Sequence, residues 1–310
     1  MGISVIIVAV TVCLNFDLTL NRETSKIKVR IIASNNFGKD LMFDEERYVS
    51  PESSAIDALR EVAEVETAYG GGFVNSINGV NSKYTGTSMV KQDWFFYING
   101  IFANVGGLEY KLSDGDVEQW DFHNWNFKTH VTATIGFFPE PFLHGYGGEV
   151  RKTIVVYEEN LEEEARLVAR VLTELGVENV STLDERELSS DERGGSNLII
   201  LGTIGSKTIS ELNEIHERLG LHVYFKGSEM VVLDSKGQIT EQHANGGVIQ
   251  ASQNPWNPKG TMASENVVWT IVGIDEEDLK NTIDVLIERR SEFQYSFAVT
   301  MVEDQICRIP

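Results

Sequence analysis

The feature that most constrains the fold is an Asn-Gly pair, Asn99-Gly100, between two runs of aromatic and aliphatic residues. Trp94–Ile98 precedes the pair and Ile101–Val105 follows it. Both residues of such a pair tolerate the positive φ angles of a type I′ turn, which joins two antiparallel strands. The sequence therefore predicts a β-hairpin over residues 94–105.

Another hairpin and a helix are predicted ahead of it. Ile27–Ala33 alternates with the period of a half-buried strand, and Leu41–Tyr48 is its expected antiparallel partner. Ser53 or Ser54 is expected to cap a helix, and Asp57, three residues after Ser54, could cap the first turn reciprocally with it.

Two more strands, Val117–Phe122 and Val131–Phe138, are predicted after the central hairpin. Residues 27–138 are thus expected to form one domain, in which a hairpin and a helix precede further antiparallel strands. This is the element order of a β-grasp fold.

The pattern of the sequence changes after residue 138. Residues 139–149 are rich in Pro and Gly and are predicted to be a linker. Buried-type strands such as Thr153–Tyr157 and Val267–Ile274 then alternate with segments of helical period. Residues 150–310 are therefore expected to form an α/β domain with a mixed sheet. The predicted fold class is α+β followed by α/β.

The N-terminal segment indicates export. The apolar run Ile3–Leu14 has the length of a signal-peptide core and is too short to span a bilayer. Residues 1–26 are expected to be a signal peptide or membrane anchor with a linker, and the protein to be extracellular or attached to the cell surface. Whether the segment is cleaved or retained is left open. The alternative is a buried first strand over Val5–Val12.

The formal net charge of −21 limits the class of partner. Such a charge repels the nucleic-acid backbone, and no cluster of Lys and Arg offsets it locally. Nucleic acid is therefore excluded as an expected partner.

Aromatic residues are concentrated between residues 94 and 127. Strand alternation places Trp94 and Phe96 on one face and Phe95 and Tyr97 on the other, so one face is expected to present aromatics to a ligand or a partner. The alternative is that they fill the core and an interface between domains. The predicted ligand-binding residues are Trp94, Tyr97, Asn99, Phe102, Tyr110, Trp120 and Trp125.

The segments Gly72–Val80, Trp94–Gly100 and Tyr110–Asp116, followed by Trp120, resemble the C-terminal β-grasp domain of the transcobalamin and intrinsic factor family. The resemblance covers residues 27–125. It implies a β-grasp fold, with cobalamin or another corrinoid as a candidate ligand.

A weaker resemblance concerns the second half. Gly246–Val248, Asn254–Pro258 and Val267–Gly273 are similar to α/β modules of archaeal surface-layer and envelope proteins. This resemblance implies a cell-surface location.

The sequence does not predict a metal site or catalytic residues. His123, His130 and His144, with a carboxylate such as Asp121, do not have the spacing of a compact metal motif. The segment Leu201–Ser206 lies where α/β folds bind phosphates, but it lacks a phosphate-binding motif and is expected to be a plain turn. The chain lacks the nucleophile-elbow and zinc-protease motifs, so an enzyme is not favoured.

Three functions remain in order of preference. The first is an exported or cell-surface protein that binds a small ligand or a partner domain through an aromatic face. The second is a structural envelope protein without a small-molecule ligand, and the third is an extracellular hydrolase. The ligand, the oligomeric state and the role of the α/β domain are left open.

Overall fold

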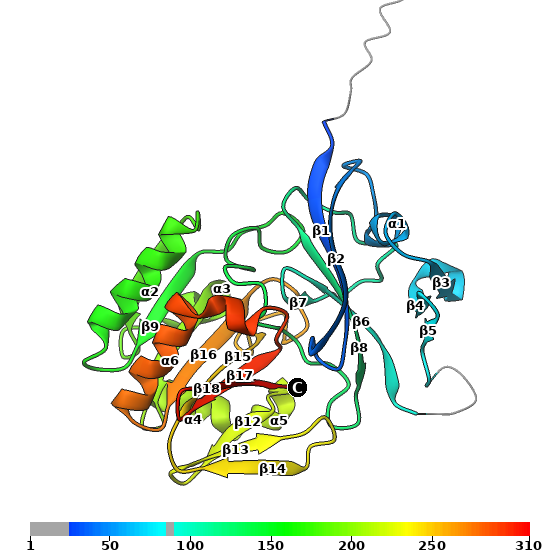
Figure 1. Cartoon of the computed structure of the whole chain (residues 1–310). Coiled ribbons are helices and arrows are strands. Elements are labelled where there is room, and N and C mark those ends of the chain that lie inside the picture. The colour runs from blue at the N-terminus through cyan, green and yellow to red at the C-terminus, as the bar shows by residue number, and fades with distance from the viewer. Residues whose placement is uncertain (1–24, 85–89) are drawn as a thin grey trace, which may run out of the picture.

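The computed structural model describes residues 25–84 and 90–310. There the chain is a mixed α/β protein with a five-stranded sheet, a seven-stranded sheet and two three-stranded sheets (Figure 1). The apolar run expected to direct export lies outside the described residues. Within them, no helix combines the length and the apolar character needed to cross a membrane.

The five-stranded sheet has the order β2-β1-β8-β6-β7. Its strands are β1 (Ile27–Asn35), β2 (Asp40–Val49), β6 (Gln92–Ile98), β7 (Ile101–Phe102) and β8 (Val117–Asn124). Strands β1 and β8 are parallel, and the other neighbours are antiparallel. The hairpin predicted at Asn99-Gly100 is confirmed, with φ of 50° and 76° at the two residues. Strand β7 is shorter than predicted.

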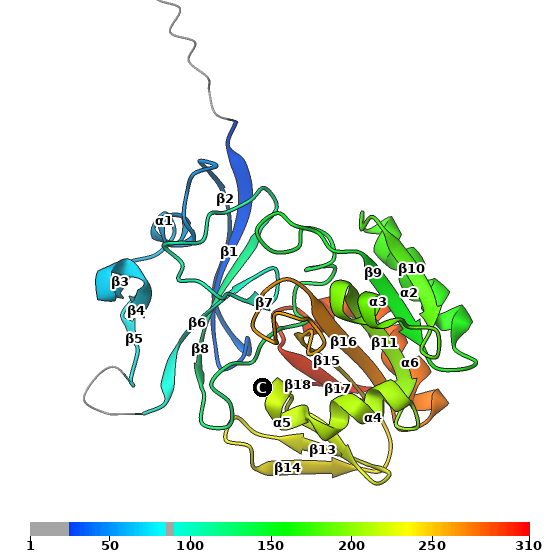
Figure 2. The ribbon, with the colours of Figure 1, turned by 180° about the vertical axis from the view of Figure 1, so that it is seen from behind.

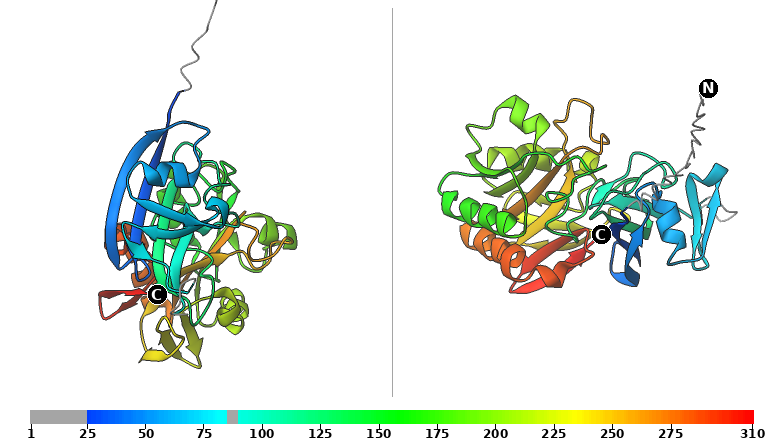
Figure 3. Two further views of the ribbon diagram at one scale, coloured as in Figure 1. Left: turned by 90° about the vertical axis from the view of Figure 1, so that its right-hand side faces the viewer. Right: turned by 90° about the horizontal axis from the view of Figure 1, so that it is seen from above.

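Helix α1 (Ala55–Arg60) packs on one face of this sheet. It begins at Ser54, and Ser54 and Asp57 form the predicted capping box. A small sheet follows, made of β3 (Val65–Ala68), β4 (Phe73–Ile77) and β5 (Val80–Asn81), with a 3₁₀ turn at Tyr69–Gly71 between β3 and β4. Helix α1 and the small sheet lie at the end of the molecule farthest from the seven-stranded sheet (Figures 1 and 3).

The seven-stranded sheet has the order β10-β9-β11-β16-β15-β17-β18, and its first four strands are parallel. Its strands are β9 (Thr153–Tyr157), β10 (Val180–Asp184), β11 (Asn197–Thr203), β15 (Gly247–Gln253), β16 (Val267–Gly273), β17 (Ala298–Val302) and β18 (Gln305–Ile309).

Both faces of this sheet are covered. Helices α2 (Glu162–Glu174) and α6 (Glu276–Glu288) lie on one face (Figure 1). The other face carries α3 (Ser190–Gly195), α4 (Lys207–Glu214), α5 (His216–Leu219) and the sheet of β12 (Val223–Lys226), β13 (Glu229–Leu233) and β14 (Ile239–His243) (Figure 2). Coverage of both faces explains the continuous apolar runs in these strands.

The segment after β8 differs from the prediction. Residues 131–138 do not form a strand, because their main chain bonds to several elements in turn. The Phe102 N–H donates to the Thr132 carbonyl oxygen (3.1 Å), whereas the Ile135 N–H donates to the Ser296 carbonyl oxygen (3.2 Å). Residues 139–146 of the segment predicted to be a linker are packed into the protein, with Phe142 fully buried, whereas residues 147–149 are exposed. A protease is therefore not expected to cut within residues 139–146.

Candidate functional site

The edge of the five-stranded sheet is only partly covered beside β6. The Lys83 N–H donates to the Gln92 carbonyl oxygen (2.9 Å), and the Ala103 N–H donates to the Phe96 carbonyl oxygen (3.0 Å). Residues of β6 alternate between bonding to β8 and facing away from it, so the N–H and C=O of Trp94 face the same edge as these two carbonyls. Among the described residues, Trp94 has no main-chain partner on that side.

A hollow of about 250 Å³ opens at this edge. Its walls are mainly aromatic and aliphatic side chains and bare glycine backbone. They are formed by Gly72, Phe73, Val74, Trp94, Phe95, Phe96, Phe102, Ala103, Val105, Gly106, Gly107, Trp120 and His130.

Stacked rings form much of the wall. Trp120 stacks on Phe96, with ring centroids 4.4 Å apart, and its indole N–H donates to Glu118 Oε1 (2.5 Å). Glu118 is fully buried, and burial raises the pKa of this carboxyl well above its ordinary value. The rings of Phe102 and His130, which also line the hollow, have centroids 4.6 Å apart.

His130 is the only titratable side chain among the lining residues. Burial lowers the pKa of His130 below its ordinary value of 6.5, and Lys128 and His123 lower it further. The imidazole is therefore neutral at pH 7. Its Nδ1 atom is buried without a hydrogen-bond partner among the described residues. An apolar wall with a few polar groups is the usual composition of a small-molecule site.

The loop after β15 holds the β7 side of the hollow in place. Gln253 Nε2 (3.0 Å) and Ser264 Oγ (2.9 Å) both donate to the Phe102 carbonyl oxygen. Asn104 Nδ2 donates to the Ala263 carbonyl oxygen (3.2 Å).

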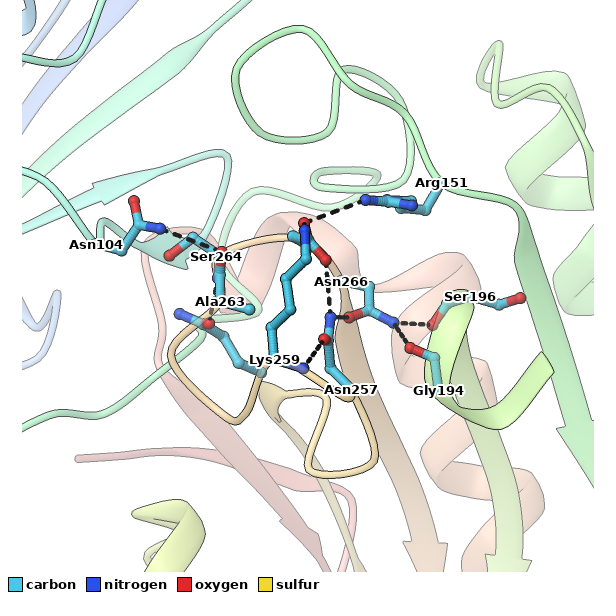
Figure 4. Close-up of polar contacts among 11 residues, drawn as sticks. Asn104, Arg151, Gly194, Ser196, Asn257, Lys259, Ala263, Ser264 and Asn266 are labelled. Atoms are coloured by element: carbon cyan, nitrogen blue, oxygen red, sulfur yellow. Dashed lines mark hydrogen bonds and ion pairs between the residues drawn. The ribbon is translucent and has the colours of Figure 1, made fainter. Parts of the chain in front are cut away.

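The same loop is anchored to the parallel part of the seven-stranded sheet. Asn266 Nδ2 donates to the carbonyl oxygens of Gly194 (3.0 Å) and Ser196 (2.7 Å). Asn257 Nδ2 donates to Asn266 Oδ1 (2.7 Å) (Figure 4). One wall of the hollow is thus fixed by residues about 150 positions away in the sequence.

On another wall of the hollow, two glycines allow the main chain to pack closely against its neighbours. A Cβ atom at Gly107 would lie 2.8 Å from the Trp120 ring and 3.1 Å from Ile56 Cγ1, and one at Gly106 would lie 2.8 Å from the Gly72 carbonyl oxygen. These contacts lead the chain away from β6 after Ala103 and end β7 early. The hollow exists because of that departure.

Gly107→Ala is expected to lower the free energy of unfolding by ~1–3 kcal/mol, because the added methyl group must displace the Trp120 ring. Chemical denaturation measures the change. Gly195→Ala is the matched control, since a Cβ atom there meets nothing within 4 Å. An equal effect of both substitutions would contradict the close approach at Gly107.

Three of the seven predicted ligand-binding residues line the hollow, namely Trp94, Phe102 and Trp120. Tyr97 is fully buried, and its hydroxyl donates to the Val131 carbonyl oxygen (2.9 Å). Trp125 does not line the hollow but packs in the same cluster as Phe95 and Phe102, and its indole N–H donates to Asp93 Oδ2 (2.8 Å).

Asn99 and Tyr110 belong to a buried polar network instead. Asn99 Nδ2 donates to Asp116 Oδ1 (2.9 Å), and the Tyr110 hydroxyl donates to Asp116 Oδ2 (3.2 Å). Burial raises the pKa of Asp116 to about 6. Both residues hold the turn that enters β8 and do not reach the hollow.

The expected exposed aromatic face needs correction. Trp94 and Phe96 pack in the core against α1, while Phe95 and Tyr97 pack with Phe297 of the second half of the chain. Both faces of β6 are thus covered, and access to the aromatics is confined to the hollow at its edge. His130 also lines the hollow, although its sequence context indicated only a possible metal ligand.

The histidines considered for a metal are not brought together. His123 Nδ1 lies 2.7 Å from Asp121 Oδ1, and His144 Nδ1 lies 2.5 Å from Glu140 Oε1. In the described parts of the chain, no three His, Cys, Asp or Glu residues are grouped so that they could hold a metal ion.

At the end of the turn Leu201–Ser206, the carboxylate of Glu185 occupies the N-terminus of α4, where a phosphate would bind. Ser206 caps α4 and donates through Oγ to Glu185 Oε2 (2.8 Å), which also accepts from the Thr208 N–H (3.2 Å).

Comparison with known proteins gives one family match. Residues 52–124 match the model of a domain of unknown function, DUF4430. Every lining residue of the hollow except His130 falls within this segment. No curated protein matches the chain.

Two solved structures share a weak likeness with the chain. A candidate metal-binding protein from Ruminococcus gnavus is 16% identical, with a TM-score of 0.24, and the match covers 32% of this chain and 97% of that one. Haptocorrin in complex with Cbi is 14% identical, with a TM-score of 0.27, and the match covers 32% of this chain and 26% of that one. Because both TM-scores are this low, neither likeness supports a conclusion about this chain.

Proposed function

We propose that the protein is a binding protein that holds a ring-sized apolar group of a ligand in the aromatic hollow beside β6. The observation that carries the proposal is the hollow itself, an opening of about 250 Å³ walled by Trp94, Phe96, Phe102 and Trp120. Aromatic walls give a planar group both a large apolar contact and favourable ring stacking. The main chain of Trp94, which faces the same edge, would supply the polar contacts that orient it.

The volume of the hollow limits the ligand. Pockets that enclose a whole drug-sized molecule have about 300–1,000 Å³, so the hollow is large enough for one ring system and too small to enclose a corrin ring. A corrinoid, which the sequence resemblance implies, would have to place a substituent in the hollow and its ring outside. Cobinamide is therefore a ligand to test and not the one that the geometry favours.

Location and domain division belong to the same proposal. Export rests on the apolar run Ile3–Leu14. The division into residues 27–138 and 150–310 rests on the two large sheets, which share an interface at Phe37, Tyr97 and Phe297. N-terminal sequencing of the protein made by its natural host tests export, and an uncleaved cytosolic chain would contradict it.

A blocking substitution tests the hollow. Gly72 lines it with an ordinary negative φ, and a Cβ atom there comes no closer than 4.0 Å to another residue. Gly72→Phe is therefore expected to fold normally and to weaken binding of the neutral fluorophores naphthylamine and N-phenylnaphthylamine at least about tenfold, as loss of a ring contact would. Fluorescence titration measures both affinities.

Two control variants make the result specific. Gly195→Phe adds the same ring at a distant glycine with open space around it, and Tyr48→Ala removes a 61% exposed aromatic residue that does not line the hollow. Both are expected to bind the two fluorophores as the wild type does. Unchanged binding by Gly72→Phe would contradict the proposed function, and a structural role would then be the better account.

A further inference from the structure

The turn between β3 and β4 holds an aromatic residue in an unfavourable conformation. Tyr69 has φ of 51°, followed by Gly70 at 73° and Gly71 at 98°. Left-handed backbone costs a residue such as Tyr about 1–2 kcal/mol, whereas Gly adopts it freely. The side chain recovers little of this cost through burial, because Tyr69 is 82% exposed. The residue type at this position is therefore not explained by stability.

Tyr69 stands at the rim of the hollow. Its ring lies 6.1 Å from that of Phe73, which lines the hollow. Val105 is also a lining residue and is 38% exposed. Leu108 is 39% exposed and packs so closely on Gly71 that a Cβ atom there would lie 2.9 Å from Leu108 Cδ2. Three of the large exposed apolar residues thus gather beside the opening, which is typical of a binding surface.

The charge of the site limits what can bind there. None of the lining residues is acidic or basic except His130, which is neutral at pH 7. The net charge of −21 disfavours an anionic ligand. A ligand that fills the hollow with one ring and continues over the rim must be uncharged or cationic, with at least two ring systems.

We propose that Tyr69 is a second ligand-contact residue, whose ring stacks on the part of an uncharged or cationic multi-ring ligand that extends beyond the hollow. The inference rests on the proposed function of the hollow. Strained backbone is tolerated where a side chain must be presented for binding. The exposed ring, its position beside Phe73 and the strain at Tyr69 then have one explanation.

A pair of probes of different length tests this role. Naphthylamine is expected to fit within the hollow, whereas N-phenylnaphthylamine carries an additional phenyl ring that is expected to reach the rim. Tyr69→Gly relieves the left-handed strain, so we expect an equal or higher thermal midpoint. The same variant is expected to bind N-phenylnaphthylamine about three- to tenfold more weakly, the effect of one lost ring stack. Its affinity for naphthylamine is expected to stay unchanged.

Companion variants separate the explanations. Tyr69→Phe keeps the ring and should bind both probes as the wild type does. Tyr69→Asn also tolerates left-handed backbone and should reproduce the loss seen with Tyr69→Gly. Tyr48→Ala removes a 61% exposed tyrosine from β2 and should have no effect.

Three results would each contradict a part of the proposal. If Gly72→Phe blocks both probes and Tyr69→Gly weakens neither, the role of Tyr69 is overturned and the hollow stands as the site. If Gly72→Phe blocks neither probe, the proposed function itself fails. Equal weakening of both probes by Tyr69→Gly also overturns the inference, because the short probe does not reach the rim.

Discussion

Asp121→Ala is expected to lower the free energy of unfolding by ~3–5 kcal/mol, because it removes a buried charge on which four hydrogen bonds converge. Asp121 is fully buried. Its Oδ1 accepts from the Phe37 N–H (3.0 Å) and lies 2.7 Å from His123 Nδ1. Its Oδ2 accepts from the Gly38 N–H (2.8 Å) and from Ser34 Oγ (2.6 Å). The substitution leaves these donors buried without an acceptor.

The local backbone increases the expected loss. Phe37 has φ of 60°, so the turn between β1 and β2 is not a conformation that its side chain favours. The Phe37 ring stacks on His123, with centroids 4.2 Å apart, and is buried against Phe297 of the second half. Without the carboxylate, both the turn and this contact between the halves lose their support.

Denaturation by urea at pH 7 measures the effect. Asp40→Ala, at the exposed end of the same turn, serves as the control and is expected to change stability by less than about 0.5 kcal/mol. A loss below about 1 kcal/mol in Asp121→Ala would show that the carboxylate is not the central support of this turn.

Local sequence signals predicted the parts of the fold that depend on local physics. Asn99-Gly100 determines a tight turn by its own backbone preferences, and Ser54 with Asp57 caps α1 within four residues. The run Val131–Phe138 was predicted incorrectly because its apolar residues bridge two sheets, and the sequence period does not distinguish a bridging segment from a strand.

The candidate site was predicted less well than the fold for a related reason. Alternation along β6 correctly separated Trp94 and Phe96 from Phe95 and Tyr97, but it cannot show which face is covered. Phe297 covers one face from about 200 positions away in the sequence. The opening at the strand edge depends on Gly107 and Trp120 approaching each other, which is a tertiary contact without a local signal.

Acid is expected to destabilise the protein through His222, which is 3% exposed in the contact between the two halves. Its ring lies 5.6 Å from that of Phe37 and 5.0 Å from that of Phe127. The pKa of His222 is lowered from 6.5 to about 3, mainly by burial and also by the neighbouring His123 and Lys39, while Asp234 opposes the shift. The folded protein therefore keeps this imidazole neutral where the unfolded chain protonates it.

The sign of the effect follows from this difference. Above about pH 6.5 the imidazole is neutral in both states, so the stabilising contribution is fully present. As the pH falls from about 6.5 to about 3, only the unfolded chain takes up the proton, and stability is lost progressively. Over that window the loss is on the order of 5 kcal/mol, since each pKa unit corresponds to about 1.4 kcal/mol.

Comparison of the wild type with His222→Phe isolates this contribution, because other groups titrate in the same range. Burial raises the pKa of Asp116 to about 6, so that carboxyl stabilises the protein below its unfolded pKa and this contribution is lost as the pH rises through about 6. Its effect is the same in both proteins and cancels in the difference. Phenylalanine keeps the aromatic contacts of His222 without a titrating group.

The free energies of unfolding of the two proteins, measured by urea denaturation from pH 8 to pH 4, should therefore diverge below about pH 6.5, with the wild type losing more. Parallel pH profiles would show that His222 is protonated equally in the folded and unfolded chain, and that the contact between the two halves admits the charge.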